Sequence, residues 1–232
     1  NAQSVQVYGG EDAATPDYGK VYISIKAKSG SNLTEVTKVG LVQSLKSFAV
    51  ASVTPVIIDP ETTFIILETT FKYDSSATTK DISTLQTNVI NAISSYNTDT
   101  LENFTGVFRY STVGKTIDDA DTSILSNITK VKMYKHITPT LNSGLKYTLS
   151  FNNAFYNPHS GHNATGGGII SSTGFKINDD SSTNEHFLDD DGAGNIRVYY
   201  LSGTTRIYTN STFGTVNYTT GEIILTSANI TS

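Results

Sequence analysis

The 232-residue sequence contains no cysteine and no tryptophan. The absence of cysteine excludes a disulfide framework, a thiolate zinc site and a cysteine nucleophile. The longest apolar runs, such as FIIL at 64–67, are far too short to span a bilayer, so no membrane partner is expected. Lysine and arginine form no cluster, so the electrostatic footprint of a nucleic-acid-binding protein is missing.

Charge is scarce: charged residues make up 16% of the chain, the net charge is −5 and the pI is near 5.3. Much of the remainder is threonine, serine, asparagine and glycine, a composition typical of strands, turns and solvated surfaces rather than helical bundles. The chain begins at Asn1 with neither methionine nor an apolar signal segment, which indicates a piece of a longer protein. A cysteine-free chain suits folding in a reducing cytoplasm.

The beginning of the chain predicts three elements. Residues 1–20 contain turn formers and little periodicity, so we expect an extended segment there. Strict alternation of apolar and polar residues at 21–27 predicts a half-buried strand. Asn32 and Glu35 resemble a capping box, and apolar residues at helical spacing follow, so a helix is expected over 33–48.

Two strands follow. The run VTPVIIDP predicts a strand at the edge or the start of a sheet, because Pro55 cannot donate to a hydrogen-bond ladder. The run TTFIILETTFKYD predicts a longer strand with one face made by Ile65, Leu67, Phe71 and Tyr73.

The strongest helical pattern begins near Thr78 and Asp81 and is expected to end at NTDT. Its apolar stripe contains Ile82, Leu85, Val89, Ile93 and Tyr96. The alternating run TKVKMYKHI then predicts another strand. The resulting order over 21–139 is a split β-α-β-β-α-β module, with two helices on one face of a small sheet. Its expected core comprises Ile65, Leu67, Phe71, Leu85, Val89 and Ile93.

After Pro139 the pattern changes. From Leu145 to the end, short alternating runs are separated by glycine, asparagine and aspartate, without a helical stripe. This pattern predicts an antiparallel sheet, sandwich or set of hairpins over 140–232. The expected fold class is therefore α+β, with a split β-α-β-β-α-β module followed by an all-β antiparallel module.

An acidic, glycine-rich stretch, HFLDDDGAGNIRVYYLSG, is the first candidate site. Asp189, Asp191 and Asn195 fall at positions that calcium ligands occupy in an EF-hand loop, but Ala193 and Tyr200 replace two required oxygen ligands. Asp-Gly and Gly-Asn pairs between strand-like flanks instead favour a hairpin turn. Three adjacent carboxylates leave open weak cation binding at high concentration.

A second candidate is the histidine pair His159 and His162 in a Pro/Gly loop. With a third ligand such as His186 or an aspartate, this pair would suit zinc, but two solvent-exposed histidines are the simpler interpretation. The triple glycine at 166–168 lacks the strand, lysine and helix of a phosphate-binding loop.

A third acidic cluster comprises Asp118, Asp119 and Asp121. Paired carboxylates serve glycoside hydrolysis. We favour instead the start of a short helix whose apolar side is Ile124, Leu125 and Ile128, because aspartates stabilise a helix N-terminus. No G-x-S-x-G motif is present, and a chain without tryptophan lacks a common aromatic platform of sugar clefts.

Five collinear blocks resemble the C-terminal half of the baseplate wedge subunits of T-even-type contractile-tailed phages, which are similar to the wider baseplate-J-like family. The blocks are YGGEDAATPDYGKVYISIK, FRYSTVGKTIDDADTSILSNITKVKMYKHITPTL, FNNAFYNPHSGH, LDDDGAGNIRVYYL and GTVNYTTGEIIL. Together they reach from about residue 7 to 230. The resemblance implies a helix-then-strand step at 117–133 and a turn between strands at LDDDGAGN.

The resemblance further implies a structural virion protein with no catalytic residues, metal or cofactor. Its partners would be a second copy and other wedge proteins, and six wedges would form a ring coupled to sheath contraction. The location would be the virion tail baseplate, after assembly in the host cytoplasm. The alternative is a calcium- or carbohydrate-binding β module of a surface adhesin, which would explain the acidic loop but not the α+β half. A hydrolase has only carboxylate pairs in its favour.

Overall fold

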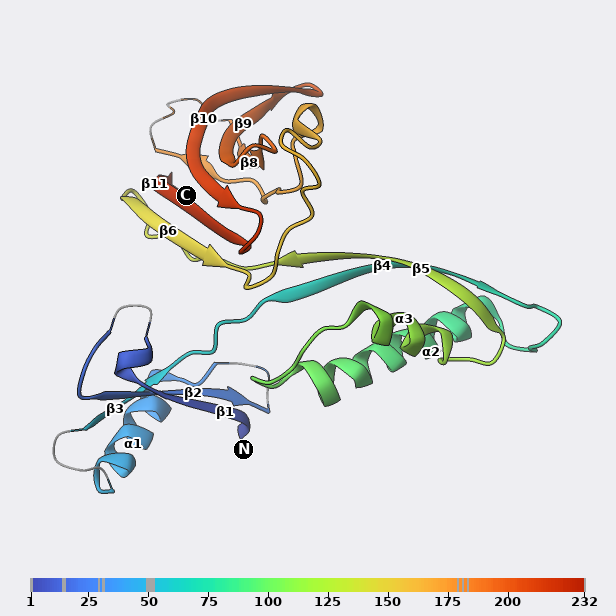
Figure 1. Ribbon diagram of the computed structural model, residues 1–232, viewed down its shortest axis with the longest axis horizontal. Coiled ribbons are helices and arrows are strands. Elements are labelled where there is room, and N and C mark those ends of the chain that lie inside the picture. The colour runs from blue at the N-terminus through green and yellow to red at the C-terminus, as the bar shows by residue number, and fades with distance from the viewer. Residues whose placement is uncertain are drawn as a thin grey trace. The chain divides into compact units, whose positions relative to one another are not determined.

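Figure 1 shows the computed structural model of the chain, which describes residues 2–13, 16–28, 30, 32–48, 53–178, 180, 182 and 184–231. The chain divides into two compact units, Asn1–Lys132 and Met133–Ser232. Strands dominate, and the helices α1–α3 all belong to the first unit, so the expected α+β class is confirmed. The division expected from sequence, into 1–20, 21–139 and 140–232, stays a prediction about separate modules.

The first sheet contains β1 (Ala2–Gly9), β2 (Lys20–Ala27) and β3 (Thr54–Ile58) in the order β1-β2-β3. Strand β2 pairs antiparallel with β1 and parallel with β3. The alternation at 21–27 therefore marked a real strand, and Pro55 does lie on an edge strand.

Strand β1 corrects the expectation for residues 1–20. The segment is extended, but residues 2–9 are a paired strand rather than a segment without periodicity, and a short 3₁₀ turn follows at Gly10–Asp12. The reason is a weak alternation, in which Val5 and Val7 stand opposite the isoleucines of β2.

Helix α1 (Glu35–Lys46) lies within the expected range but begins differently. The N-cap is Thr34, whose hydroxyl accepts a hydrogen bond from the backbone nitrogen of Thr37 at 3.3 Å. The cap expected at Asn32 is therefore wrong by two residues, because a threonine closer to the first turn satisfies its free amide.

Helix α2 (Ile82–Tyr96) carries the predicted apolar stripe, of which Leu85 and Val89 are buried. Asp81 is itself the N-cap and accepts from the backbone nitrogen of Thr84 at 2.9 Å, so the helix starts later than expected. The α-helix ends at Tyr96, directly before the run NTDT, as expected. A π-helical turn at Asn97–Leu101 follows it.

Helix α3 (Tyr110–Asp118) and strand β5 (Ile124–Tyr134) correct the interpretation of the Asp118–Asp121 cluster. The aspartates lie at and after the C-terminal end of a helix instead of starting one, and the apolar residues after them belong to a strand. Val113 and Ile117 decide the helix, because their spacing of four places both in the buried cluster under α2. The helix-then-strand step implied by the family resemblance is present.

Strand β4 (Phe64–Tyr73) pairs with β5 in a separate two-stranded sheet, and the two run in opposite directions in Figure 1. The expected single sheet of a split βαβ module is therefore wrong. The inner face of β4 packs Leu67 and Phe71 against the cluster formed with α2 and α3, so β4 has a core of its own. Strand β3 instead closes the first sheet.

The second unit contains an antiparallel sheet that curls into a half-barrel (Figure 1), as the alternating runs after Pro139 predicted. The strand order is β6-β11-β10-β9-β8, and short β7 pairs with β11. The strands are β6 (Gly144–Ser150), β7 (Lys176–Ile177), β8 (His186–Asp190), β9 (Asn195–Ser202), β10 (Thr205–Asn217) and β11 (Glu222–Thr231).

Strand β10 joins two runs that the sequence presented separately, TTRIYTN and GTVNY. Its pairing with β9 shifts twice between Tyr208 and Gly214, which lets one strand bend strongly around the unit. The core under this bend contains eight buried apolar residues: Ile196, Val198, Phe213, Val216, Ile223, Leu225, Ala228 and Ile230. None of the helices in the described part of the chain has the length and apolar content needed to cross a bilayer.

Candidate functional site

The acidic segment between β8 and β9 forms a hairpin turn, and the two strands pair directly on either side of it. Asp191 organises the turn. Its Oδ1 accepts from the backbone nitrogens of Ala193 and Asn195 at 2.8 and 3.0 Å, and its Oδ2 accepts from Asn195 Nδ2 at 2.6 Å. Burial raises the pKa of Asp191, but these hydrogen bonds outweigh it, so the pKa lies below its usual value.

Asp189 lies on one face of β8 and is 2% exposed. Its Oδ1 accepts from Arg197 Nε at 2.9 Å, and its Oδ2 accepts from Arg206 Nη1 and Tyr208 Oη, both at 2.8 Å. The guanidinium of Arg197 lies 4.4 Å from the ring centroid of Tyr208, and that of Arg206 lies 4.8 Å from Tyr199. The carboxylate therefore has two cations and a hydroxyl as partners, in a layer of alternating arginines and tyrosines.

Asp190 points to the opposite face and is fully buried. Its Oδ1 accepts from the backbone nitrogens of Ile169 and Ile170, both at 2.7 Å. Its Oδ2 accepts from the backbone nitrogen of Gly192 at 3.1 Å and from Tyr218 Oη at 2.6 Å. Burial and the hydrogen bond to this carboxylate raise the pKa of Tyr218. Asp190 thus fixes the long segment before β7 to the sheet.

Gly168, the last residue of the triple glycine, and Gly192 in the hairpin turn allow this close packing. A Cβ at Gly168 would lie 2.2 Å from the Asp190 carboxyl group, and a Cβ at Gly192 would lie 2.6 Å from the backbone nitrogen of His162. Both glycines have positive φ, which other residues rarely adopt. The close approach of neighbouring groups to the backbone therefore explains why glycine occupies both positions.

The histidines considered as zinc ligands are His159, His162 and His186. His159 and His162 pack edge to face, with ring centroids 5.2 Å apart, and His159 Nδ1 lies 3.1 Å from the carbonyl oxygen of Ser160. His186 is buried in β8, with Nε2 3.0 Å from Asp180 Oδ2. In the part of the chain that the structure describes, no three His, Cys, Asp or Glu side chains are placed to hold one metal ion.

We expect calcium to leave the stability of this protein unchanged, because Asp189 and Asp191 are already engaged by protein donors. Thermal melts in excess calcium and in chelator should coincide. An upward shift of several degrees in calcium would show cation binding to the folded state. That result would favour the adhesin alternative.

The second acidic cluster is also divided among separate partners. Asp121 is buried and accepts from Lys80 Nζ and from the nitrogen and hydroxyl of Ser123. Lys80, followed by Ser123, lowers the pKa of Asp121. The other two carboxylates bind elsewhere: Asp118 accepts from Asn127, and Asp119 pairs with Lys115. These carboxylates are joined to neighbouring elements rather than paired across a shared substrate cleft.

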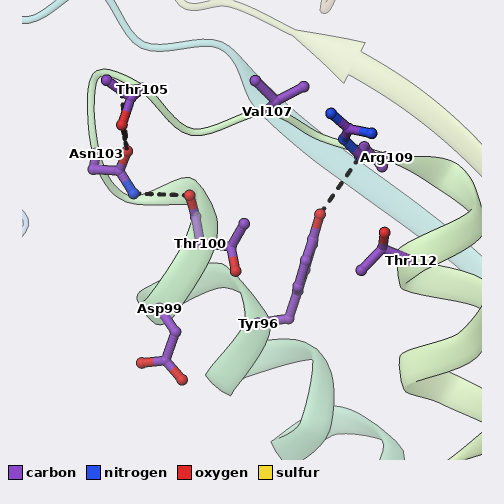
Figure 2. A pocket seen from close by; sticks show the side chains of 8 residues that line it. All are labelled: Tyr96, Asp99, Thr100, Asn103, Thr105, Val107, Arg109 and Thr112. Atoms are coloured by element: carbon purple, nitrogen blue, oxygen red, sulfur yellow. Dashed lines mark hydrogen bonds between the residues drawn. The ribbon is translucent and has the colours of Figure 1, made fainter.

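A surface hollow of about 480 Å³ lies beside the π-helical turn (Figure 2). Tyr96 Oη accepts from the backbone nitrogen of Arg109 at 3.4 Å, and Asn103 donates to the carbonyl oxygen of Thr100 at 2.8 Å. Its lining is mostly polar: Tyr96, Asp99, Thr100, Asn103, Thr105, Val107, Arg109 and Thr112. Such a lining offers hydrogen bonds to a polar segment but shows no nucleophile beside a general base.

The block that contains β1–β3 and α1 leaves much apolar surface exposed. Val36 and Phe48 are 84% and 88% exposed, and Val5 and Val7 on β1 are 51% and 59% exposed. In the described part of residues 2–58, the buried apolar side chains are those of Pro55 and Ile57. Exposed apolar surface around so small a core is typical of a protein-protein contact.

The sequence assigned no interaction residues. It also did not predict strand β1 with its exposed valines, or the side chains that contact Asp189. The alternation of Val5 and Val7 with polar neighbours was a usable signal for β1. Arg197, Arg206 and Tyr208 lie in runs recognised as strands, but nothing local indicated that all three contact Asp189.

Two family models match the chain in order. Residues 1–58 match the model described as baseplate structural protein gp6, C-terminal domain I, and residues 61–136 match C-terminal domain III of the same protein. The baseplate wedge protein gp6 of Enterobacteria phage T4 is 30% identical over 148 residues. That alignment covers 62% of this chain and 22% of the relative, so the chain spans well under a third of that relative's length.

These matches support a gp6-like baseplate protein, and the expected location in the virion tail baseplate is confirmed at this level. They describe a structural protein, which fits a non-enzymatic role. The wider baseplate-J-like grouping stays a prediction.

Proposed function

We propose that this chain is a structural, non-catalytic part of the baseplate wedge of a contractile phage tail. In this proposal it associates with a second copy, joins other wedge proteins and contributes to the ring whose rearrangement accompanies sheath contraction. The observation that carries the proposal is the ordered match of residues 1–58 and 61–136 to two C-terminal domains of gp6.

The structure supports this proposal through its surfaces. The block around α1 and β1 exposes apolar side chains such as Val36 and Val7. A structural subunit needs complementary surfaces of this kind, whereas an enzyme needs converging reactive groups. The carboxylates of Asp189, Asp190 and Asp121 are occupied in holding loops and strands together. They therefore contribute to a rigid scaffold.

Self-association is tested by measuring the mass by light scattering over a concentration series. We expect the apparent mass to rise from one copy toward two. A stable two-fold contact would bury roughly 1,200 Å² or more in total. If other parts of a longer protein contribute to the contact, the midpoint will lie at high concentration.

Wedge membership is tested separately, by co-expression with the tail proteins encoded beside this chain. We expect at least one of them to co-purify at a fixed stoichiometry. A chain that stays monomeric at high concentration and also binds none of these proteins would contradict the proposed function.

A further inference from the structure

We propose that β1 pairs edge to edge and antiparallel with β1 of a second copy. The two three-stranded sheets would thereby join into one six-stranded sheet around a two-fold axis. This inference rests on the self-association proposed above and identifies its surface.

Strand β1 is an edge strand whose described ladder partner is β2. Side chains near its start contact a neighbouring segment: Gln3 Nε2 donates to the carbonyl oxygen of Thr98 at 3.4 Å, and Ser4 Oγ accepts from the backbone nitrogen of Phe104 at 3.3 Å. These bonds involve the side chains of β1 rather than its backbone. An edge strand presents a row of backbone donors and acceptors to any further strand.

The edge strands of this chain differ in how they are protected. Natural edges carry charges or proline, which oppose the addition of another strand. The sequence of β1, AQSVQVYG, contains neither. The other edge strands of the three sheets all do: Pro55 in β3, Glu68 and Lys72 in β4, Lys130 and Lys132 in β5, Lys146 in β6, and Asp189 and Asp190 in β8.

The absence of charged residues from β1 favours a second copy of this chain as its partner strand. A two-fold contact places the same strand of both copies side by side, so an edge that carries charges of one sign would repel itself. An uncharged edge meets no such repulsion. Val5 and Val7 alternate along β1 and would face valines of the second copy, where cross-strand pairs of β-branched residues are favourable.

The poor burial of this block supports the same contact. Val5 and Val7 are 51% and 59% exposed, although they belong to the face formed with Ile25 and Ile23 of β2. A longer sheet would shield these valines on one side and pair the outward-facing backbone groups of β1.

A cysteine scan tests the pairing, because the chain has no native cysteine to interfere. Ser4, Val5, Gln6, Val7 and Tyr8 are changed to cysteine one at a time and the variants are oxidised at a concentration where the dimer forms. In a two-fold antiparallel pair one residue lies opposite itself, with Cα atoms about 4.5–5.5 Å apart, within disulfide range. We expect one position to form covalent dimer at least several-fold faster than its neighbours.

Val107→Cys is the matched control, because Val107 is 58% exposed, as Val7 is to within one per cent. Lysine substitutions at Val7 and Val107 give a second test that needs no oxidation. Val7→Lys should weaken the dimer on the order of tenfold by placing like charges across the strands, whereas Val107→Lys should not. Circular dichroism checks that each variant keeps its secondary structure.

The outcomes separate the two proposals. A wild-type dimer that forms no disulfide above the Val107→Cys level and tolerates Val7→Lys would overturn the β1 contact and leave self-association intact. A wild-type chain that stays monomeric at every concentration would overturn both. Capture of a neighbouring tail protein by that monomer would still support wedge membership.

Discussion

Asp190→Ala is expected to lower the free energy of unfolding of the second unit by about 3–5 kcal/mol. The fully buried carboxylate accepts from the backbone nitrogens of Ile169, Ile170 and Gly192 and from the hydroxyl of Tyr218. Alanine leaves these donors in a dry environment without an acceptor, and each such loss costs roughly 1–3 kcal/mol before water enters. Chemical denaturation followed by near-UV circular dichroism measures the change.

Asp99→Ala is the control for Asp190→Ala, because Asp99 is an exposed aspartate on the π-helical turn. It should change stability by less than about 0.5 kcal/mol. Tyr218→Phe should cost about 1 kcal/mol alone and much less in an Asp190→Ala background, since the two groups share a hydrogen bond. Equal stability of Asp190→Ala and Asp99→Ala would show that the carboxylate does not hold the loop.

Val89→Asp is expected to destabilise the first unit by about 4 kcal/mol or more, because it places an unpaired charge in an apolar cluster. Val89 is 5% exposed and belongs to the cluster that also contains Val113, Ile117 and Ile124. The described helices all lie in this unit, so the helical signal in far-UV circular dichroism reports its unfolding.

Ile90→Asp makes the matched control for Val89→Asp, since Ile90 is the next residue of the same helix and is 62% exposed. It adds the same charge to the same helix without burying it and should melt within a few degrees of the wild type. If Val89→Asp and Ile90→Asp unfolded at the same temperature, the described packing of α2 against α3 would be wrong.

Elements with a strong local period could be predicted from the sequence. Alternation identified β2 and β4, and the stripe through Leu85 and Val89 identified α2, because burial of one face imposes its period on the residues. The hairpin turn at Asp191 could be predicted for a similar reason, since aspartate and glycine have local turn preferences.

The remaining features depend on distant contacts. Strand β1 is bounded by turn-forming residues and has only Val5 and Val7 on its apolar face, so its pairing with β2 decides its structure. Helix α3 has few apolar residues, and its packing against α2 outweighs the helix-start preference of the aspartates at and after its C-terminal end. The separation of β4 from the first sheet likewise follows from packing on α2 and α3.

The arrangement of the candidate site also depends on distant contacts. The sequence placed Asp189 and Asp191 near each other but gave no sign of where their side chains point. The partners of Asp189 include Arg206 and Tyr208 on another strand, and those of Asp190 include Tyr218, 28 residues away. Only the folded sheet brings these groups together, and in doing so it divides the carboxylates among different protein donors.

The adjacent carboxylates Asp189 and Asp190 have one consequence for how β8 aligns with β9. Hydrophobic alternation opposes a slip of one residue, because such a slip exchanges the two faces of the strand, but it tolerates a slip of two residues. After a slip of two residues, Leu188 or Gly192 would take the position of Asp190, and the amides of Ile169 and Ile170 would lose their acceptor. The carboxylate of Asp190 would leave these donors, and a buried charge without partners costs several kcal/mol. Asp190 therefore discriminates against the misaligned hairpins that alternation alone would allow.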